Sequence, residues 1–155
     1  METVLDDESI RIINDAATIK VIATVNDFAV PHVVFKDLLY ANEDGMLVLC
    51  ELIETSVTNE NLVRSIWFGK KVVMNFQDKN KKSLMVEGIP VQAIVSGKEF
   101  QKYYIAIRRI YGNVDVSTIW IIKPICLQEK TLKKRIHEEE ELHPMITHLD
   151  RIVHD

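Results

Sequence analysis

The sequence has 155 residues, of which 47% are hydrophobic and 27% charged, and its formal net charge is −4. These values are typical of one globular domain with its own core. The acidic balance argues against nucleic acid as the main partner, because phosphate backbones bind clustered lysine and arginine. No apolar run is long enough to span a membrane, and the acidic residues 1–8 lack the apolar segment of a signal peptide. We therefore expect a cytoplasmic protein in which Cys50 and Cys126 are buried free thiols without metal-ligand spacing.

The chain begins with a predicted helix followed by three strands. Asp6 and Asp7 favour a helix start. One side of this helix is apolar and carries Ile10, Ile13 and Ala17. The β-branched stretch 18–25 predicts the first strand, and residues 32–40, which follow Pro31, predict the second. Residues 42–45, Asn-Glu-Asp-Gly, predict a hairpin turn into a third strand, 46–53, so the second and third strands should pair in antiparallel.

Polar side chains crowd the stretch that follows the third strand. They are Thr55, Ser56, Thr58, Asn59 and Asn61. Hydroxyl and amide groups of this kind cap the free N–H groups at the start of a helix. The same free N–H groups, at the positive end of a helix dipole, also suit a phosphate group. The stretch alone is consistent with both an ordinary capped helix and a phosphate site.

The remainder of the domain predicts two helices and three further strands. The first helix has Leu62, Ile66 and Trp67 inward and ends at Gly69. Strands follow at 70–76, 83–95 and 117–127, and the helix between the last two follows Ser96 and runs towards Gly112. Gly88 and Pro90 predict a bulge or corner in the longest strand. About six strands in hairpin order favour a closed or nearly closed antiparallel barrel, since closure removes exposed sheet edges.

Some aromatic and histidine side chains allow two interpretations. We expect Trp67 and Trp120 in the core, and the alternative is a position beside a ring at an interface. His32, at the start of the second strand, is expected to be structural, although it could hydrogen-bond a ligand.

Residues 129–155 form a charged C-terminal extension with a helical pattern. Lys133–Arg135 precede Glu138–Glu141, which predicts ion pairs one helical turn apart. The histidines of this region, His137, His143, His148 and His154, are not spaced to meet on one helix face, so we expect a solvated helix rather than a metal site. Apolar residues recur at intervals of three and four and predict one amphipathic helix, packed on the barrel or on a partner subunit: Leu142, Met145, Ile146, Leu149, Ile152 and Val153.

Several short phrases, in this order, resemble the FMN-binding split-barrel family, which includes pyridoxamine 5′-phosphate oxidases and small FMN-binding proteins. They are Val21-Ile-Ala-Thr-Val25, Pro31-His-Val-Val34, Thr58-Asn-Glu-Asn-Leu62, Val86-Glu-Gly88, Gly97-Lys-Glu-Phe100 and Ile122-Lys-Pro124. The resemblance implies a mainly β fold with short helices, in which residues 1–128 form an antiparallel six-stranded split barrel and residues 129–155 a helical tail. It also implies a homodimer that binds FMN without a covalent bond at the subunit interface.

By position, the resemblance assigns the cofactor to three segments of the chain. The second strand contributes Phe35, Lys36 and Asp37. The third strand lines the flavin ring with Leu49, Cys50, Glu51 and Leu52. The polar stretch approaches the phosphate with Ser56, Val57, Thr58 and Asn61. Relatives often have lysine at the position of Val57, so Lys36 or Arg64 is the expected cationic partner of the phosphate here.

The function implied is that of an FMN-binding flavoprotein and FMN-dependent oxidoreductase that transfers hydride or electrons. The cofactor would supply the chemistry, so no catalytic side chain is assigned, and the substrate and electron partner stay open. A non-enzymatic split-barrel module for another planar or phosphorylated ligand is the alternative, motivated by Val57. A pyridoxamine 5′-phosphate oxidase is a third reading, for which only Arg108 and Arg109 offer a basic site for the substrate's phosphate.

Overall fold

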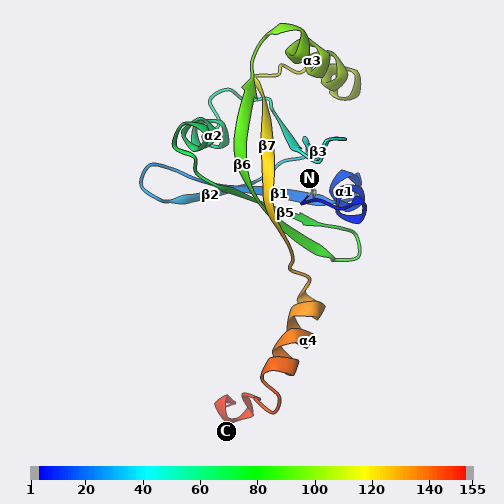
Figure 1. The fold of residues 1–155 in the computed structure, drawn as a ribbon, viewed down its shortest axis with the longest axis vertical. Coiled ribbons are helices and arrows are strands. Elements are labelled where there is room, and N and C mark those ends of the chain that lie inside the picture. Colours follow the sequence, from blue (N-terminus) through cyan, green and yellow to red (C-terminus); the bar gives the residue numbers. More distant parts are fainter. Residues whose placement is uncertain (1–3, 153–155) are drawn as a thin grey trace.

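The computed structural model describes residues 4–152. Its centre is one curled antiparallel sheet of seven strands in the order β2-β1-β5-β6-β7-β4-β3 (Figure 1). The strands are β1 Ile19–Val25, β2 Pro31–Phe35, β3 Leu39–Ala41, β4 Leu47–Glu51, β5 Val72–Gln77, β6 Ser83–Ile94 and β7 Thr118–Glu129. This is the predicted split-barrel architecture, with seven strands in place of the predicted six.

The additional strand arises because the predicted second strand is two strands. β2 ends at Phe35 and pairs with β1, so that Val34 lies opposite Ile22. Residues 36–38 then carry the chain to β3, which pairs with β4 and places Tyr40 opposite Val48. The hairpin turn between β3 and β4 is confirmed, since the Asn42 side chain accepts hydrogen bonds from the backbone N–H groups of residues 44 and 46.

Within residues 4–152, four α-helices and a short 3-10 helix accompany the sheet. They are α1 Asp7–Asn14, α2 Val57–Phe68, α3 Gly97–Tyr111, α4 Leu132–Leu142 and η1 Leu149–Arg151. Figure 1 shows α1 and α2 beside the sheet, whereas α3 and α4 lie at opposite ends of the molecule. None of the helices in residues 4–152 is long and apolar enough to cross a membrane.

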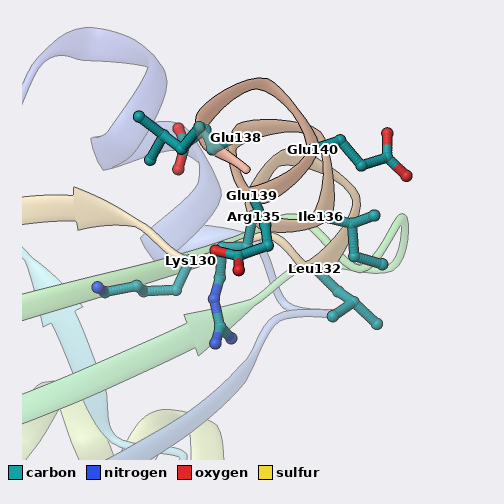
Figure 2. A pocket seen from close by; sticks show the side chains of 8 residues that line it. Lys130, Leu132, Arg135, Ile136, Glu138, Glu139 and Glu140 are labelled. Carbon is teal, nitrogen blue, oxygen red and sulfur yellow. The ribbon is translucent and has the colours of Figure 1, made fainter. Parts of the chain in front are cut away.

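The C-terminal extension differs from the predicted amphipathic helix. α4 ends at Leu142, Pro144 follows almost at once, and Met145 has a left-handed backbone with φ of 71°. A proline removes a helical hydrogen bond, so the apolar residues from 142 to 152 do not form one continuous stripe. No residue of α4 is buried, so it does not pack on its own barrel (Figures 1 and 2). Val153 and His154 lie outside the described residues.

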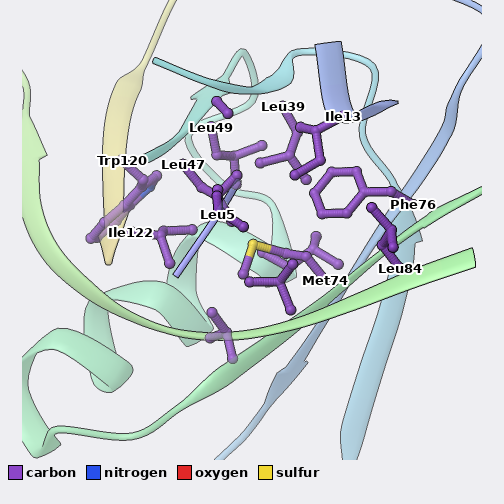
Figure 3. Close-up of a cluster of buried hydrophobic side chains, with 14 of the residues drawn as sticks. Leu5, Ile13, Leu39, Leu47, Leu49, Met74, Phe76, Leu84, Trp120 and Ile122 are labelled. Carbon is purple, nitrogen blue, oxygen red and sulfur yellow. The ribbon is translucent and has the colours of Figure 1, made fainter. Parts of the chain in front are cut away.

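The main core lies inside the curl of the sheet, where Trp120, Phe76 and Met74 are fully buried (Figure 3). The predicted core position of Trp120 is therefore confirmed. The prediction for Trp67 is wrong, because this side chain is 79% exposed near the end of α2. In α1 the core residues are Ile12 and Ile13, while the predicted Ala17 lies beyond the helix and is exposed.

The predicted irregularity in the longest strand is also confirmed. The register between β6 and β7 shifts between Glu87 and Gly88 and again between Pro90 and Gln92. A Cβ atom on Gly88 would lie 2.6 Å from the Ile122 side chain and 3.1 Å from the Lys123 carbonyl oxygen. Gly88 is therefore required because β7 approaches too closely for any side chain.

Candidate functional site

A pocket of about 330 Å³ opens where the β2–β3 connection meets the end of β4. Its lining is Phe35, Lys36, Asp37, Leu38, Cys50, Glu51, Leu52, Ile53 and Tyr111. Two segments distant in sequence come together here because β3 and β4 form a hairpin, which places residues 36–38 beside residues 50–53. The backbone N–H of Cys50 donates to the Leu38 carbonyl oxygen over 2.9 Å and fixes this juxtaposition.

An ion pair joins the two segments at the pocket. Lys36 Nζ lies 2.8 Å from Glu51 Oε2, and Glu51 is almost completely buried. The second carboxylate oxygen of Glu51 accepts a hydrogen bond from the backbone N–H of Ile53 over 3.2 Å. Lys36 is therefore neutralised within the chain. Arg64, the other expected phosphate partner, lies 3.0 Å from Asp27 on the β1–β2 turn.

The thiol and phenol groups behind the pocket are held in their neutral forms by burial. Burial raises the pKa of the Cys50 thiol from 9.0 to about 12. Burial also raises the pKa of Tyr40, and Cys50 and Tyr103 add smaller effects in the same direction. These groups belong to a second apolar cluster between α3 and the β4–β7 pair. Cys50 is thus a weak nucleophile in this structure, since the thiolate is the reactive form.

The polar stretch forms the start of α2, as predicted. The Ser56 hydroxyl caps the helix by accepting a hydrogen bond from the Asn59 backbone N–H over 3.0 Å. Only two residues separate Ile53, at the pocket, from Ser56, and Ser56 N–H donates to the Ile53 carbonyl oxygen over 3.1 Å. Because a residue spans at most about 3.6 Å, the helix start lies within about 11 Å of the pocket rim. The first backbone N–H groups of α2 have no intrahelical acceptors.

Two predicted phosphate contacts from this stretch point into the protein. Thr58 and Asn61 are buried, and the Asn61 amide donates to Thr24 of β1 over 3.0 Å. The remaining oxygen of the Asn61 side chain is buried without a hydrogen-bond partner. The neighbouring Asn59 accepts from the Trp120 indole N–H over 2.9 Å and so ties α2 to the core. These side chains position the helix, which leaves the backbone and the half-exposed Val57 to face a ligand.

Leu49 does not line the pocket, because its side chain is fully buried in the main core. Side chains alternate along a strand, so Leu49 and Cys50 point to opposite faces of β4. The structure thus brings together Phe35, Lys36, Asp37, Cys50, Glu51 and Leu52, while Ser56, Val57, Thr58 and Asn61 lie at the start of α2 and do not line the pocket.

Three lining residues were not predicted from the sequence. Leu38 and Ile53 are the next residues after the predicted segments 35–37 and 49–52, so extending each segment by one residue would have included them. Tyr111 ends α3 and reaches the pocket only through the packing of that helix on the sheet, which no local pattern indicates.

An open apolar face of the sheet adjoins the pocket. Across β2, β1 and β5, Val33 lies opposite Ala23, and Ala23 lies opposite Val73. The next row begins with Phe35, which is 71% exposed and also lines the pocket. This outer sheet face carries partly or fully exposed apolar side chains, with the half-buried Asn75 between Val21 and Met85. Its apolar residues are Val21, Ala23, Val33, Phe35, Val73 and Met85. Exposed apolar patches of this kind mark interaction surfaces.

Within residues 4–152, no group of three or more His, Cys, Asp or Glu side chains is arranged to hold a metal ion. Of the C-terminal histidines, His137, His143 and His148 are exposed along the extension, and His137 Nε2 lies 3.1 Å from Glu141 Oε1.

No protein-family model and no curated protein matches the sequence. Solved structures do match. HupZ of Group A Streptococcus has a TM-score of 0.66 at 16% identity, over 83% of this chain and 95% of that chain. An FMN-binding protein of Syntrophomonas wolfei has a TM-score of 0.63 at 15% identity, over 81% of this chain and 86% of that chain. A candidate pyridoxamine 5′-phosphate oxidase of Lactobacillus delbrueckii has a TM-score of 0.61 at 15% identity, over 82% of this chain and 95% of that chain.

The chain therefore has the split-barrel fold shared by FMN-binding proteins and proteins similar to pyridoxamine 5′-phosphate oxidases. The same fold also occurs in HutZ, a heme storage protein of Vibrio cholerae, with a TM-score of 0.55 at 13% identity, over 81% of this chain and 94% of that chain. At these identities the likeness establishes the fold, and the fold alone carries more than one ligand.

Proposed function

We propose that this protein is a homodimeric flavoprotein that binds FMN non-covalently and uses it for hydride or electron transfer. The observation that carries this proposal is the pocket between residues 35–38 and 50–53, directly beside the capped start of α2. A planar ring needs an apolar slot with backbone groups at its edge, and a phosphate needs free N–H groups nearby. Residues 50–58 contribute to both features, since residues 50–53 line the pocket and residues 57 and 58 begin α2.

The residues of the site fit the two parts of FMN in different ways. Phe35, Leu38 and Leu52 offer apolar surface that excludes water from a ring. The phosphate is assigned to the backbone N–H groups of Val57 and Thr58 rather than to Lys36, since Glu51 already neutralises that ammonium group. When bound, FMN supplies the redox chemistry, and this chain supplies binding, orientation and exclusion of water.

The second subunit is assigned to the outer sheet face. This face is apolar and open in the single chain, and Phe35 belongs both to it and to the pocket. A copy packed against it would therefore close the pocket from one side and bury side chains such as Val33 and Phe35. The cytoplasmic location stays a prediction from the sequence.

The proposal is tested by titrating the purified chain with FMN and, as a matched control, with riboflavin, which lacks the phosphate. Flavin fluorescence reports binding. We expect FMN to bind at least tenfold more tightly than riboflavin, because a hydrogen bond to a charged group contributes about 1.5–3 kcal/mol. Equal affinities would contradict the assignment of the phosphate to the start of α2. If neither compound binds, the proposal of a flavin cofactor is wrong.

A non-enzymatic module for another planar ligand is the second candidate. The Lys36–Glu51 ion pair favours this candidate, because a lysine already paired with a carboxylate is less available to a phosphate group. Native mass spectrometry of the purified protein distinguishes the two, since a retained ligand with a mass other than that of FMN supports the module. Heme is less well matched, because no histidine is among the described residues that line the pocket and the Cys50 thiol is neutral.

Oxidation of pyridoxamine 5′-phosphate is the least supported activity. Arg108 donates hydrogen bonds to Tyr104 and Asn113, over 2.8 and 2.6 Å, and is held within α3 and the loop after it. Arg108 therefore already uses donors within the chain, and the exposed Arg109 is the less engaged of the two basic side chains. If FMN-loaded protein oxidises pyridoxamine 5′-phosphate with oxygen, this activity is supported after all.

A further inference from the structure

The short strand β3 has one backbone edge that no strand covers. Within residues 4–152, β3 is the last strand of the sheet and pairs only with β4. On the paired edge, the Cys50 N–H donates to the Leu38 carbonyl oxygen over 2.9 Å. Successive residues of a strand direct their backbone groups to alternate sides, so those of Leu39 and Ala41 point away from β4. Such groups need other partners when they are buried.

Two side chains provide these partners. Asn14, at the end of α1, binds Ala41 twice, since its amide donates to the carbonyl oxygen and its side-chain oxygen accepts from the N–H, each over 2.8 Å. Lys20 of β1 donates from Nζ to the Leu39 carbonyl oxygen over 2.6 Å. The free edge of β3 is therefore joined to α1 and β1 by side chains rather than by another strand.

Lys20 is a buried lysine. It lies on the core-facing side of β1, in line with Ile22 and Thr24. A buried ammonium group costs free energy that only specific contacts offset. Burial lowers the pKa of Lys20, and the carboxylates of Asp37 and Asp15 partly oppose this effect. Because Asp37 lines the pocket, the buried ammonium interacts with a charge of the pocket wall.

Lys20 also holds both ends of the connection between β2 and β3. At the start of this connection, the backbone N–H of Lys36 donates to the Lys20 carbonyl oxygen over 3.0 Å. At its end, the Leu39 carbonyl oxygen accepts from the Lys20 ammonium group. Residues 36–38 lie between these two points, and all three line the pocket. Lys20 itself is not among the described residues that line it.

We infer that Lys20 is a positioning residue, which holds the pocket wall formed by residues 36–38 in the arrangement that a bound flavin requires. Lys20 acts through the backbone of Leu39 and does not touch the ligand. A wall that is correctly arranged for only part of the time raises the apparent dissociation constant in proportion. This role rests on the proposed flavin function for its ligand, whereas the hold on the wall can be measured without flavin.

Fluorescence titration with FMN provides the first test. Lys20→Met keeps a long side chain but removes the donor to the Leu39 carbonyl oxygen. Asn14→Ala is the matched control, because it removes the bonds to Ala41 and neither residue lines the pocket. We expect the dissociation constant of FMN to rise about tenfold or more in Lys20→Met and less than about twofold in Asn14→Ala. An unchanged constant in Lys20→Met, or equal rises in both variants, would overturn the inference.

Amide hydrogen exchange tests the hold on the wall without flavin. The Cys50 N–H closes the β3–β4 hairpin beside the pocket, and the Asn42 N–H closes it at the turn by donating to the Met46 carbonyl oxygen over 2.9 Å. In Lys20→Met we expect the exchange rate of Cys50, relative to that of Asn42, to rise about tenfold, because local opening exposes only nearby amides. Asn14→Ala controls for global unfolding and should not raise this ratio. Equal ratios in the two variants would show that Lys20 only stabilises the fold.

Two further outcomes remain decisive. If the unsubstituted chain binds no FMN, the proposed function fails, and the exchange ratio alone decides whether Lys20 holds the wall. If Lys20→Met does not fold, nuclear magnetic resonance of the unsubstituted chain replaces it. Low denaturant concentrations should then speed the exchange of the Lys20 ammonium protons and of the Cys50 N–H in parallel, because both depend on the same local opening. Exchange of Cys50 that is independent of the Lys20 ammonium group would contradict the assigned role.

Discussion

The Lys36–Glu51 pair is the residue contact on which the site depends most directly. Glu51 ends β4 and Lys36 follows β2, so the pair fastens the two segments that form the pocket. The carboxylate has almost no contact with solvent and would be left unpaired if the lysine were removed. An uncompensated buried charge is among the costliest single defects in a folded protein.

Lys36→Ala should therefore lower the free energy of unfolding by about 2–3 kcal/mol, below the range for a fully buried pair because Lys36 keeps some solvent contact. Adding Glu51→Gln should recover part of this loss, since the remaining amide is neutral. Urea denaturation of the three variants measures both effects. Additive losses in the double variant would show that the two residues do not interact.

Because of Cys50, the stability of the protein should fall at alkaline pH. Its pKa is raised from 9.0 to about 12 in the folded chain, so between these values the folded state keeps a proton that the unfolded state loses. The free energy of unfolding should fall as pH rises through this window, by up to about 1.4 kcal/mol per pH unit. Denaturation at several pH values should show a shallower fall for Cys50→Ala than for the unsubstituted protein, and an equal fall in both would contradict the raised pKa of Cys50.

Positions of single site residues were predictable only where strand pairing fixes them. The segments 35–37 and 50–52 lie together as expected because a hairpin fixes them. The pairing of Lys36 with Glu51 was not predicted, since it depends on the exact turn between β2 and β3. Trp67 was assigned to the core because of its size, yet its position on α2 leaves it exposed.

At the scale of elements, α2 and α3 form a natural comparison of helix starts. Ser56 caps α2 through its hydroxyl, whereas Ser96 at the start of α3 makes no capping hydrogen bond from its side chain. Ser56→Ala should lower the free energy of unfolding by about 1 kcal/mol, because the Asn59 N–H loses its acceptor. Ser96→Ala should change it by less than half as much. Equal effects in denaturant titrations would contradict the assigned caps.

Element order was largely predictable, because the alternation of strands, the Asn42–Gly45 turn and the Gly88 bulge have local signals. The break between β2 and β3 was missed, since residues 36–38 carry neither glycine nor proline. The C-terminal helix was extended too far because its apolar spacing outweighed the Pro144 signal. At the β2–β3 break, propensity fails because tertiary packing decides where the strand ends.

At the scale of the whole molecule, the outer sheet face should bind the second subunit. Val33→Glu places a charge on this face, on edge strand β2, at a side chain that is already 63% exposed, so the fold should survive. We expect light scattering to show a monomer and the FMN affinity to fall at least tenfold, because the partner closes the pocket. Val95→Glu, 60% exposed just beyond β6, is the matched control and should keep both properties. A dimer that persists in Val33→Glu would place the interface elsewhere.

The visible absorption spectrum of the purified protein tests the proposed flavin site most directly. The chain should be incubated with FMN, freed of unbound cofactor by gel filtration, and compared with a sample treated with riboflavin. We predict flavin absorption bands that co-elute with the protein after FMN treatment and are weaker after riboflavin treatment. A protein that remains colourless after both would contradict the proposal that this split barrel is a flavoprotein.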